Sequence, residues 1–179
     1  TNLTFTSTSK TVWVECPTGG VADLEFEART TNGSVICEDK IHFYAFSSII
    51  IAFGGRTQTP NDPPDANEGV FFAALDLYTN GFDVHMYDEN SLATDGSGIP
   101  YIETSNAVSR RGVTSVGIFG YSYGGDATHD LARRLDDNRA NIGTFNITYS
   151  AYVDAIARPF WASQTERPQG SLFHANYYQ

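Results

Sequence analysis

Apolar runs alternate with helix-like stripes along residues 47–179, and this alternation limits the chain to few folds. Residues 49–53 form an unbroken apolar run, as expected of a strand that is buried on both faces. Val70, Ala74 and Leu77 then recur at helical spacing. Strands that alternate with helices form right-handed crossover units and a parallel sheet. We therefore predict an α/β fold whose mostly parallel sheet carries helices on both faces.

The rest of this predicted domain follows the same rule. Further strands are expected at residues 82–87, 113–119, 144–152 and 170–178, and further helices at about residues 101–111 and 124–137. A polar stretch rich in Asp, Asn and Gly separates the second strand from the helix that follows it. This stretch is predicted to be a loop.

Residues 1–46 have a different pattern. Apolar side chains occupy every second position, as at Leu24, Phe26 and Ala28. Asn32-Gly33 separates two such segments and is a strong hairpin signal. The pattern predicts antiparallel β structure with one face in water. Because this stretch holds too few strands for a complete sandwich, it is expected to extend the next domain or to end a domain that begins upstream.

Composition excludes several functional classes. The chain has 11 Lys and Arg residues and 21 Asp and Glu residues, so its formal net charge is −10. This negative charge argues against nucleic acid as a partner. Aromatic residues make up 13% of the chain, too many for a disordered acidic tail. The longest apolar run is far shorter than the ~20 residues that span a bilayer, so no integral membrane segment is expected.

Cys16 and Cys37 are the only cysteines. Two cysteines without CxxC spacing make a structural zinc site improbable. They are either a disulfide pair or two free thiols. The low lysine content and the excess of acidic residues are typical of secreted proteins, so the protein is expected to be extracellular.

One motif carries recognisable chemistry. Gly120-Tyr-Ser-Tyr-Gly124 matches G-x-S-x-G, directly after the strand expected at 113–119 and at the start of the helix expected at 124–137. This strand–turn–helix setting is that of a nucleophile elbow. There the turn strains the backbone of Ser122 and exposes its hydroxyl, and the two glycines let strand and helix cross closely.

Two other interpretations apply to the same residues. Gly120 and Gly125 have the spacing of a phosphate-binding loop, but Asp126 and Ala127 stand where that loop needs Lys and Ser or Thr. A carboxylate at this position makes phosphate binding a poor hypothesis. The remaining alternative is a glycine-rich turn without chemistry.

A serine nucleophile needs a base, and the base needs an acid that orients it. Asp154 follows a predicted strand and therefore lies at the carboxyl edge of the sheet, where open α/β sheets gather functional residues. The expected chain order is Ser, Asp, His. His174 follows Asp154 but lies within a strand-like segment, so the base is either His174 or a histidine beyond Gln179. The other histidines precede Asp154: His42, His85 and His129.

Two backbone amides are expected to bind an oxyanion. The first is that of Tyr123, directly after the nucleophile. The second is that of Gly55 or Arg56, in the loop that follows the strand at residues 49–53. The alternative for this loop is an ordinary turn at a strand end.

Residues 112–125, 151–156 and 176–179 together resemble lipase-like bacterial serine hydrolases of the α/β-hydrolase superfamily. The resemblance covers about residues 47–179 and implies ester or acyl cleavage with Ser122 as nucleophile and Asp154 as acid. In such sequences the segment Asn-Tyr-Tyr-Gln is usually followed by chain that carries the histidine. Residues 1–46 resemble the last strands of an immunoglobulin-like module.

These observations predict a carboxylic-ester hydrolase that works through an acyl-enzyme on a small-molecule or lipid ester. No metal or organic cofactor is implied. The alternatives are a non-catalytic binding or structural module on a hydrolase scaffold, and acyl transfer directed at peptides or thioesters, which the same triad would serve.

Overall fold

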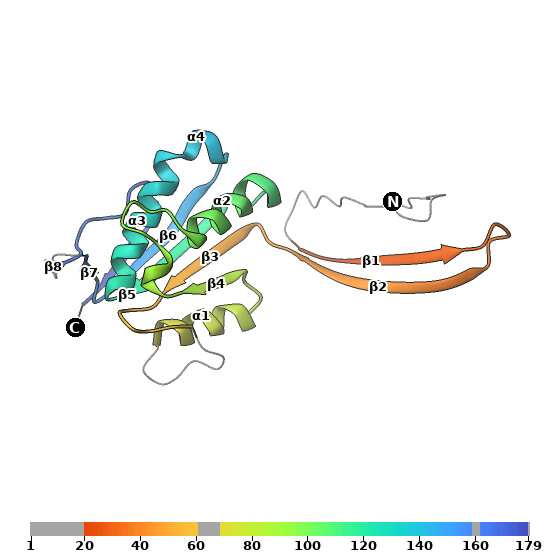
Figure 1. Cartoon of the computed structure of the whole chain (residues 1–179), viewed down its shortest axis with the longest axis horizontal. Helices are drawn as coiled ribbons and strands as arrows, with labels where there is room; N and C mark the ends of the chain where they lie inside the picture. Colours follow the sequence, from red (N-terminus) through yellow and green to blue (C-terminus); the bar gives the residue numbers. More distant parts are fainter. Residues whose placement is uncertain (1–19, 61–68, 159–161, 179) are drawn as a thin grey trace. The chain divides into compact units, whose positions relative to one another are not determined.

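The computed structural model describes residues 20–60, 69–158 and 162–178 (Figure 1). Contacts divide the chain into two compact units, residues 1–45 and residues 46–179. The boundary expected from the sequence lies after residue 46. Each unit is described by itself below.

The first unit contains an antiparallel hairpin of β1 (Gly20–Arg29) and β2 (Val35–Ala45). Its turn is closed by the Thr30 amide, which donates to the Ser34 carbonyl at 2.8 Å, and Gly33 adopts a φ of +87° there. The hairpin predicted at Asn32-Gly33 is confirmed. The Cys37 side chain is exposed, and Cys16 lies outside the described residues.

The second unit is built on a five-stranded sheet in which every neighbouring pair is parallel. The strand order is β4-β3-β5-β6-β9 (Figure 1). The strands are β3 (Ser48–Phe53), β4 (Val84–Tyr87), β5 (Ser115–Tyr121), β6 (Asn146–Val153) and β9 (His174–Tyr177). The predicted α/β class with a parallel sheet is confirmed.

Helices and short elements connect these strands. They are α1 (Gly69–Thr79), the 3₁₀ turn η1 (Glu89–Ser91), α2 (Ile99–Arg111), α3 (Tyr123–Asp137), α4 (Arg139–Ile142), and a small ladder of β7 (Ile156–Ala157) with β8 (Ala162–Ser163). The helix predicted from residue 101 begins at Ile99, because Pro100 fits the first helical turn. It ends at Arg111, and Gly112, which follows, adopts the left-handed conformation with a φ of +72°.

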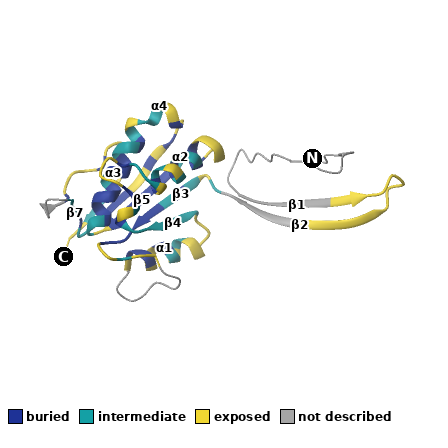
Figure 2. Cartoon of the chain, in the orientation of Figure 1, coloured by how far each residue is buried: buried dark blue, intermediate teal, exposed yellow. Residues whose placement is uncertain are grey.

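The sheet buries two apolar clusters, one on each face. Ile49, Ile51 and Phe53 pack with α2 and α3. Ala52 alternates with them and packs with α1 on the other face. Figure 2 shows buried residues along the central strands and α3. In the described part of the chain, the strands that α1 contacts most are β3 and β4, so this helix lies toward the β4 edge of its face of the sheet.

The helices are all short or polar. Within the ranges that the structure describes, none has both the length and the apolar character needed to cross a bilayer.

Candidate active site

Ser122 is the single residue between β5 and α3, and its backbone is strained. Its φ is +54° and its ψ is −120°, a conformation that costs a non-glycine residue about 1–3 kcal/mol. Three hydrogen bonds hold it. The Ser122 amide donates to the Val153 carbonyl at 2.9 Å, and the Ser122 carbonyl accepts from Gly125 and Ile156, each at 3.0 Å. The surrounding chain therefore maintains the turn.

The two motif glycines are required by contact between strand and helix. A Cβ on Gly120 would lie 2.1 Å from the Gly124 carbonyl oxygen. A Cβ on Gly124 would lie 2.5 Å from the carbonyl oxygens of Phe53 and Gly54. Since these neighbours are backbone atoms, they cannot turn aside as a side chain would. The predicted close crossing of strand and helix is present on both sides of Ser122.

Asp154 lies beside the elbow at the carboxyl edge of the sheet. Tyr121 pairs with Val153, so the residues that follow them, Ser122 and Asp154, leave adjacent strands at the same level. Asp154 is half-buried, adopts a φ of +47°, and donates its amide to the Tyr177 carbonyl at 2.8 Å. The structure therefore brings the predicted nucleophile and the predicted acid to one edge.

A buried ion pair holds the chain after Asp154 against the helix after Ser122. The backbone N and Nε of Arg158 donate to Asp126 Oδ2 at 3.0 and 3.1 Å. Gln164 Nε2 donates to Asp126 Oδ1 at 3.2 Å. Asp126 lies in the first turn of α3, where a carboxylate also interacts favourably with the helix dipole. Sequence reasoning used Asp126 only to exclude phosphate and missed this role.

The same guanidinium reaches the loop before α2. Arg158 Nη1 donates to the Glu89 carbonyl at 2.9 Å, and Nη2 lies 3.5 Å from Asp130 Oδ2. The Glu89 side chain is buried, and burial raises the pKa of its carboxyl above the usual range. Loss of Arg158 would leave the buried carboxylate of Asp126 without its cation. Arg158 thus links η1, α3 and the segment after β6.

The glycine loop after β3 lies next to Ser122. A Cβ on Gly55 would meet a Tyr121 ring carbon at 2.8 Å and Ser122 Cβ at 3.1 Å. The Gly55 amide donates to Gln58 Oε1 at 2.7 Å. This amide can therefore bind an oxyanion only after the Gln58 side chain moves. Sequence analysis did not identify Gln58, because nothing in its spacing marks it as a neighbour of Gly55.

The other two predicted oxyanion residues also lie at this edge. Tyr123 is the first residue of α3, and Arg56 follows Gly55 in the loop. In an α-helix the first amides point away from the helix body toward its N-terminus. Tyr123 thus stands at the position that the elbow hypothesis assigns to a donor.

The structure does not bring His174 to Ser122. His174 pairs with Ser150, which pairs with Ile118, four positions before Ser122. At about 3.3 Å per residue this is roughly 13 Å along the strand direction, and β6 intervenes. His174 Nδ1 lies 2.8 Å from the buried Ser150 Oγ, and its ring packs edge-on against Tyr152. Its position is that of a packed strand residue.

The remaining imidazoles lie elsewhere too. His85, on β4, is hydrogen-bonded to Asp83. His129 lies about 10 Å along α3 from Ser122 and faces Asp130 and Glu166 at 3.6 and 3.9 Å. Among the imidazole groups whose side chains the structure describes, none lies beside Ser122.

The environment of His174 predicts a pH dependence of stability. Burial, and then the Arg167 cation, lower the pKa of His174 below its usual value. The unfolded chain therefore binds this proton more readily, so stability falls as the pH drops below about 6.5. We expect His174→Asn to reduce the slope of the free energy of unfolding against pH. The reduction should be less than about 1.4 kcal/mol per pH unit, which is the limit for one proton. Urea unfolding at pH 7.5, 6.5 and 5.5 measures it, and equal slopes in both proteins would refute the assignment.

Comparison of the chain with protein-family models, curated proteins and solved structures finds no match. Within residues 20–60, 69–158 and 162–178, no three His, Cys, Asp or Glu side chains are grouped so that they could hold a metal ion. The candidate site is therefore the carboxyl edge of the sheet, where Ser122, Asp154 and Gly55 lie.

Proposed function

We propose that this chain carries the nucleophile and acid of a lipase-like serine hydrolase of the α/β-hydrolase type, and that it cleaves carboxylic esters. Three features support the proposal. The serine turn follows a central strand of a parallel sheet, the acid follows the neighbouring strand, and a glycine loop follows the strand on the other side. This is the arrangement in which a nucleophile elbow works.

The strained backbone of Ser122 is the single observation that carries the proposal. Its φ of +54° would cost a glycine little and costs a serine about 1–3 kcal/mol. Backbone contacts leave no room for a side chain at Gly120 or Gly124. Ser122, between them, nevertheless carries a side chain with a hydroxyl. Strain of this kind gathers at functional sites. A nucleophilic role for the hydroxyl accounts for it.

In the proposed reaction, Ser122 Oγ attacks the ester carbonyl carbon while a base takes its proton. The tetrahedral oxyanion accepts hydrogen bonds from the amide of Tyr123 and from that of Gly55 or Arg56. The C–O bond to the alcohol breaks, the base returns the proton to the alcohol, and water then hydrolyses the acyl-enzyme. Asp154 orients the base, which in this proposal is a histidine that lies beyond Gln179 in the full-length protein.

A fluorophosphonate probe tests the proposal on the full-length chain. We expect it to label Ser122, and we expect Ser122→Ala to abolish labelling and to lower p-nitrophenyl acetate hydrolysis at least about 10³-fold. Ser109→Ala, an exposed serine on α2, is the matched control and should behave as wild type. Peptide mass spectrometry locates the label. A label on another serine, or none at all, would count against the mechanism.

A non-catalytic binding module on the same scaffold is the second candidate. It is favoured by one observation, namely that no imidazole with a described side chain lies beside Ser122. It predicts neither labelling nor turnover in the full-length chain, and no effect of Ser122→Ala on ligand binding. The probe experiment therefore separates the two candidates.

A further inference from the structure

The chain that follows Asp154 is bound directly to the serine turn. The Ile156 amide donates to the Ser122 carbonyl at 3.0 Å. Ala155 packs closely against the start of α3, since a Cβ on Gly125 would lie only 2.3 Å from the Ala155 Cβ. Two contacts therefore connect the residues after the proposed acid with the turn that carries the proposed nucleophile.

The carboxylate of Asp126 provides a third link. Only 7% of this side chain is exposed, and its Oδ2 accepts from the backbone N and Nε of Arg158 at 3.0 and 3.1 Å. Gln164 Nε2 donates to the Asp126 Oδ1 at 3.2 Å, and the Gln164 amide donates to the Ala155 carbonyl at 2.9 Å. The segment after Asp154 is thus attached to the first turn of α3 through two of its side chains.

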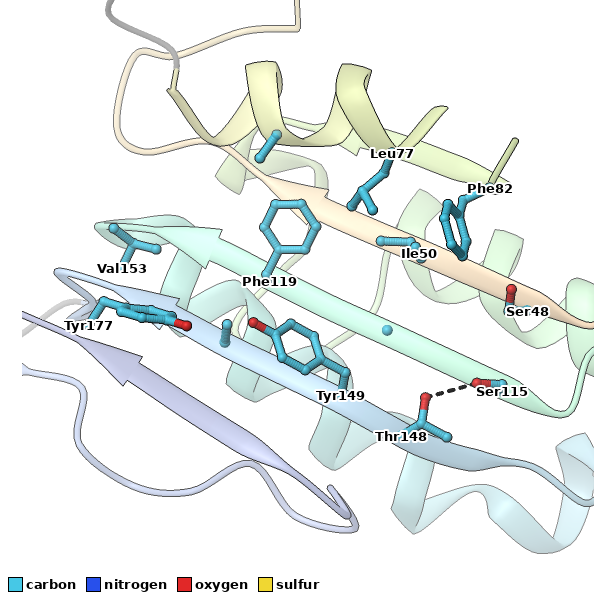
Figure 3. Close-up of a pocket in the computed structure, with 13 residues that line it drawn as sticks. Ser48, Ile50, Leu77, Phe82, Ser115, Phe119, Thr148, Tyr149, Val153 and Tyr177 are labelled. Atoms are coloured by element: carbon cyan, nitrogen blue, oxygen red, sulfur yellow. Dashed lines mark hydrogen bonds between the residues drawn. The ribbon is translucent and has the colours of Figure 1, made fainter. Parts of the chain in front are cut away.

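The face of the sheet away from α3 gives the end of β6 no such support. Among the described residues, an uncharged groove of about 570 Å³ lies on that face over β5 and β6, beside α1. Figure 3 shows Val153 and Tyr177 at one end of this groove. Because the residue before Asp154 lines a hollow, the side-chain contacts that fix this end of β6 come from the side of α3.

The two proposed catalytic residues share a backbone strain that requires support. Ser122 and Asp154 have φ values of +54° and +47°, and in the described ranges Thr57 is the only other residue with a side chain and a positive φ. Non-glycine residues keep such values only where surrounding contacts over-determine them. The three links join the neighbours of one strained residue to the neighbours of the other.

We propose that Arg158, acting through Asp126, is a positioning residue that fixes Asp154 beside Ser122. The assignment rests on the proposed function and goes beyond it, because Arg158 contacts neither substrate nor base. Only 14% of its side chain is exposed, and its described hydrogen bonds go to protein atoms. In the proposed reaction Asp154 orients the base that takes the Ser122 proton, and misplacement by about 1 Å can cost about 10²-fold in rate.

Substitutions in the full-length protein test this role. Arg158→Met removes the guanidinium but leaves the Asp126 carboxylate buried without its cation, so Asp126→Asn is combined with it in a double variant. We expect the double variant to lower kcat for p-nitrophenyl acetate about tenfold or more, with KM within about twofold of wild type. Arg158→Lys keeps the charge without the guanidinium fork and should lose less.

Arg111→Met is the matched control. It also removes an arginine from a mostly buried aspartate, since Arg111 Nη1 lies 2.9 Å from Asp83 Oδ2, but this ion pair precedes β4, at the amino end of the sheet. Its kcat should stay within about twofold of wild type. Urea unfolding of each variant shows that it is folded.

A double-mutant cycle separates positioning from a general loss of structure. If Arg158 acts through Asp154, the Asp126→Asn and Arg158→Met changes together should alter kcat less than about twofold in an Asp154→Asn background, where no carboxylate remains to be positioned. Equal losses in both backgrounds, or wild-type kcat in the double variant, would overturn the assignment and leave the proposed function standing. A wild-type protein that the fluorophosphonate probe does not label would instead refute the proposed function, and this assignment with it.

Discussion

Replacing Ser122 with glycine is expected to stabilise the protein and to abolish its proposed activity at the same time. Glycine adopts a φ of +54° without the steric cost that serine carries there, which is about 1–3 kcal/mol. Part of this gain is offset by the greater freedom of glycine in the unfolded chain. The net effect should be an increase of about 1 kcal/mol in the free energy of unfolding. Loss of Oγ removes the nucleophile, so fluorophosphonate labelling should disappear.

Urea unfolding followed by circular dichroism measures the first effect, and the slope of free energy against urea must stay constant for the comparison to hold. Ser122→Ala is the matched control. It also removes the hydroxyl but keeps a Cβ at the strained position, so its stability should stay within about 0.5 kcal/mol of wild type. A glycine variant less stable than the alanine variant would show that the turn is not strained.

The second large effect is expected at Gly120, where alanine should destabilise the protein by about 3 kcal/mol or more. Its Cβ would lie 2.1 Å from the Gly124 carbonyl oxygen and 2.3 Å from the carbonyl carbon. Relief requires β5 to move away from α3, and this movement breaks packing around Ser122. Labelling of Ser122 by the probe should therefore fall as well.

Gly117→Ala is the control for this prediction, because it makes the same change on the same strand. There the nearest atom to the new Cβ is an Ile50 side-chain carbon at 3.5 Å. A β-strand also disfavours glycine, so the substitution should change stability by less than about 1 kcal/mol. Equal losses at the two positions would mean that the close crossing of β5 and α3 is absent in solution.

Local patterns were sufficient to predict much of the fold. The unbroken apolar run at residues 49–53 predicted a strand with two buried faces, and β3 is the strand next to the edge of the parallel sheet. Asn32-Gly33 predicted the hairpin, because a tight turn depends on a few neighbouring residues. The elbow at Ser122 was predictable for the same reason. Its strand, turn and helix are consecutive in the chain.

Predictions that depended on distant pairings were weaker. His174 follows Asp154 in the expected chain order, yet the register of β9 against β6 pairs it with Ser150 and keeps it away from Ser122. The Asp126–Arg158 ion pair joins residues that are 32 positions apart, and no local signal connects them. The bond between Gln58 and the Gly55 amide depends on how one loop folds back on itself.

The amino-acid sequence by itself determined the alternation of elements, the hairpin and the strained serine between two glycines, because each follows from periodicity or from the sterics of adjacent residues. Only the tertiary structure decided which side chains meet at the carboxyl edge of the sheet. It also decided that α1 packs mainly against β3 and β4, beside an apolar groove over β5 and β6. Strand order and register decide which side chains lie close together. Both arise from packing between segments far apart in the chain.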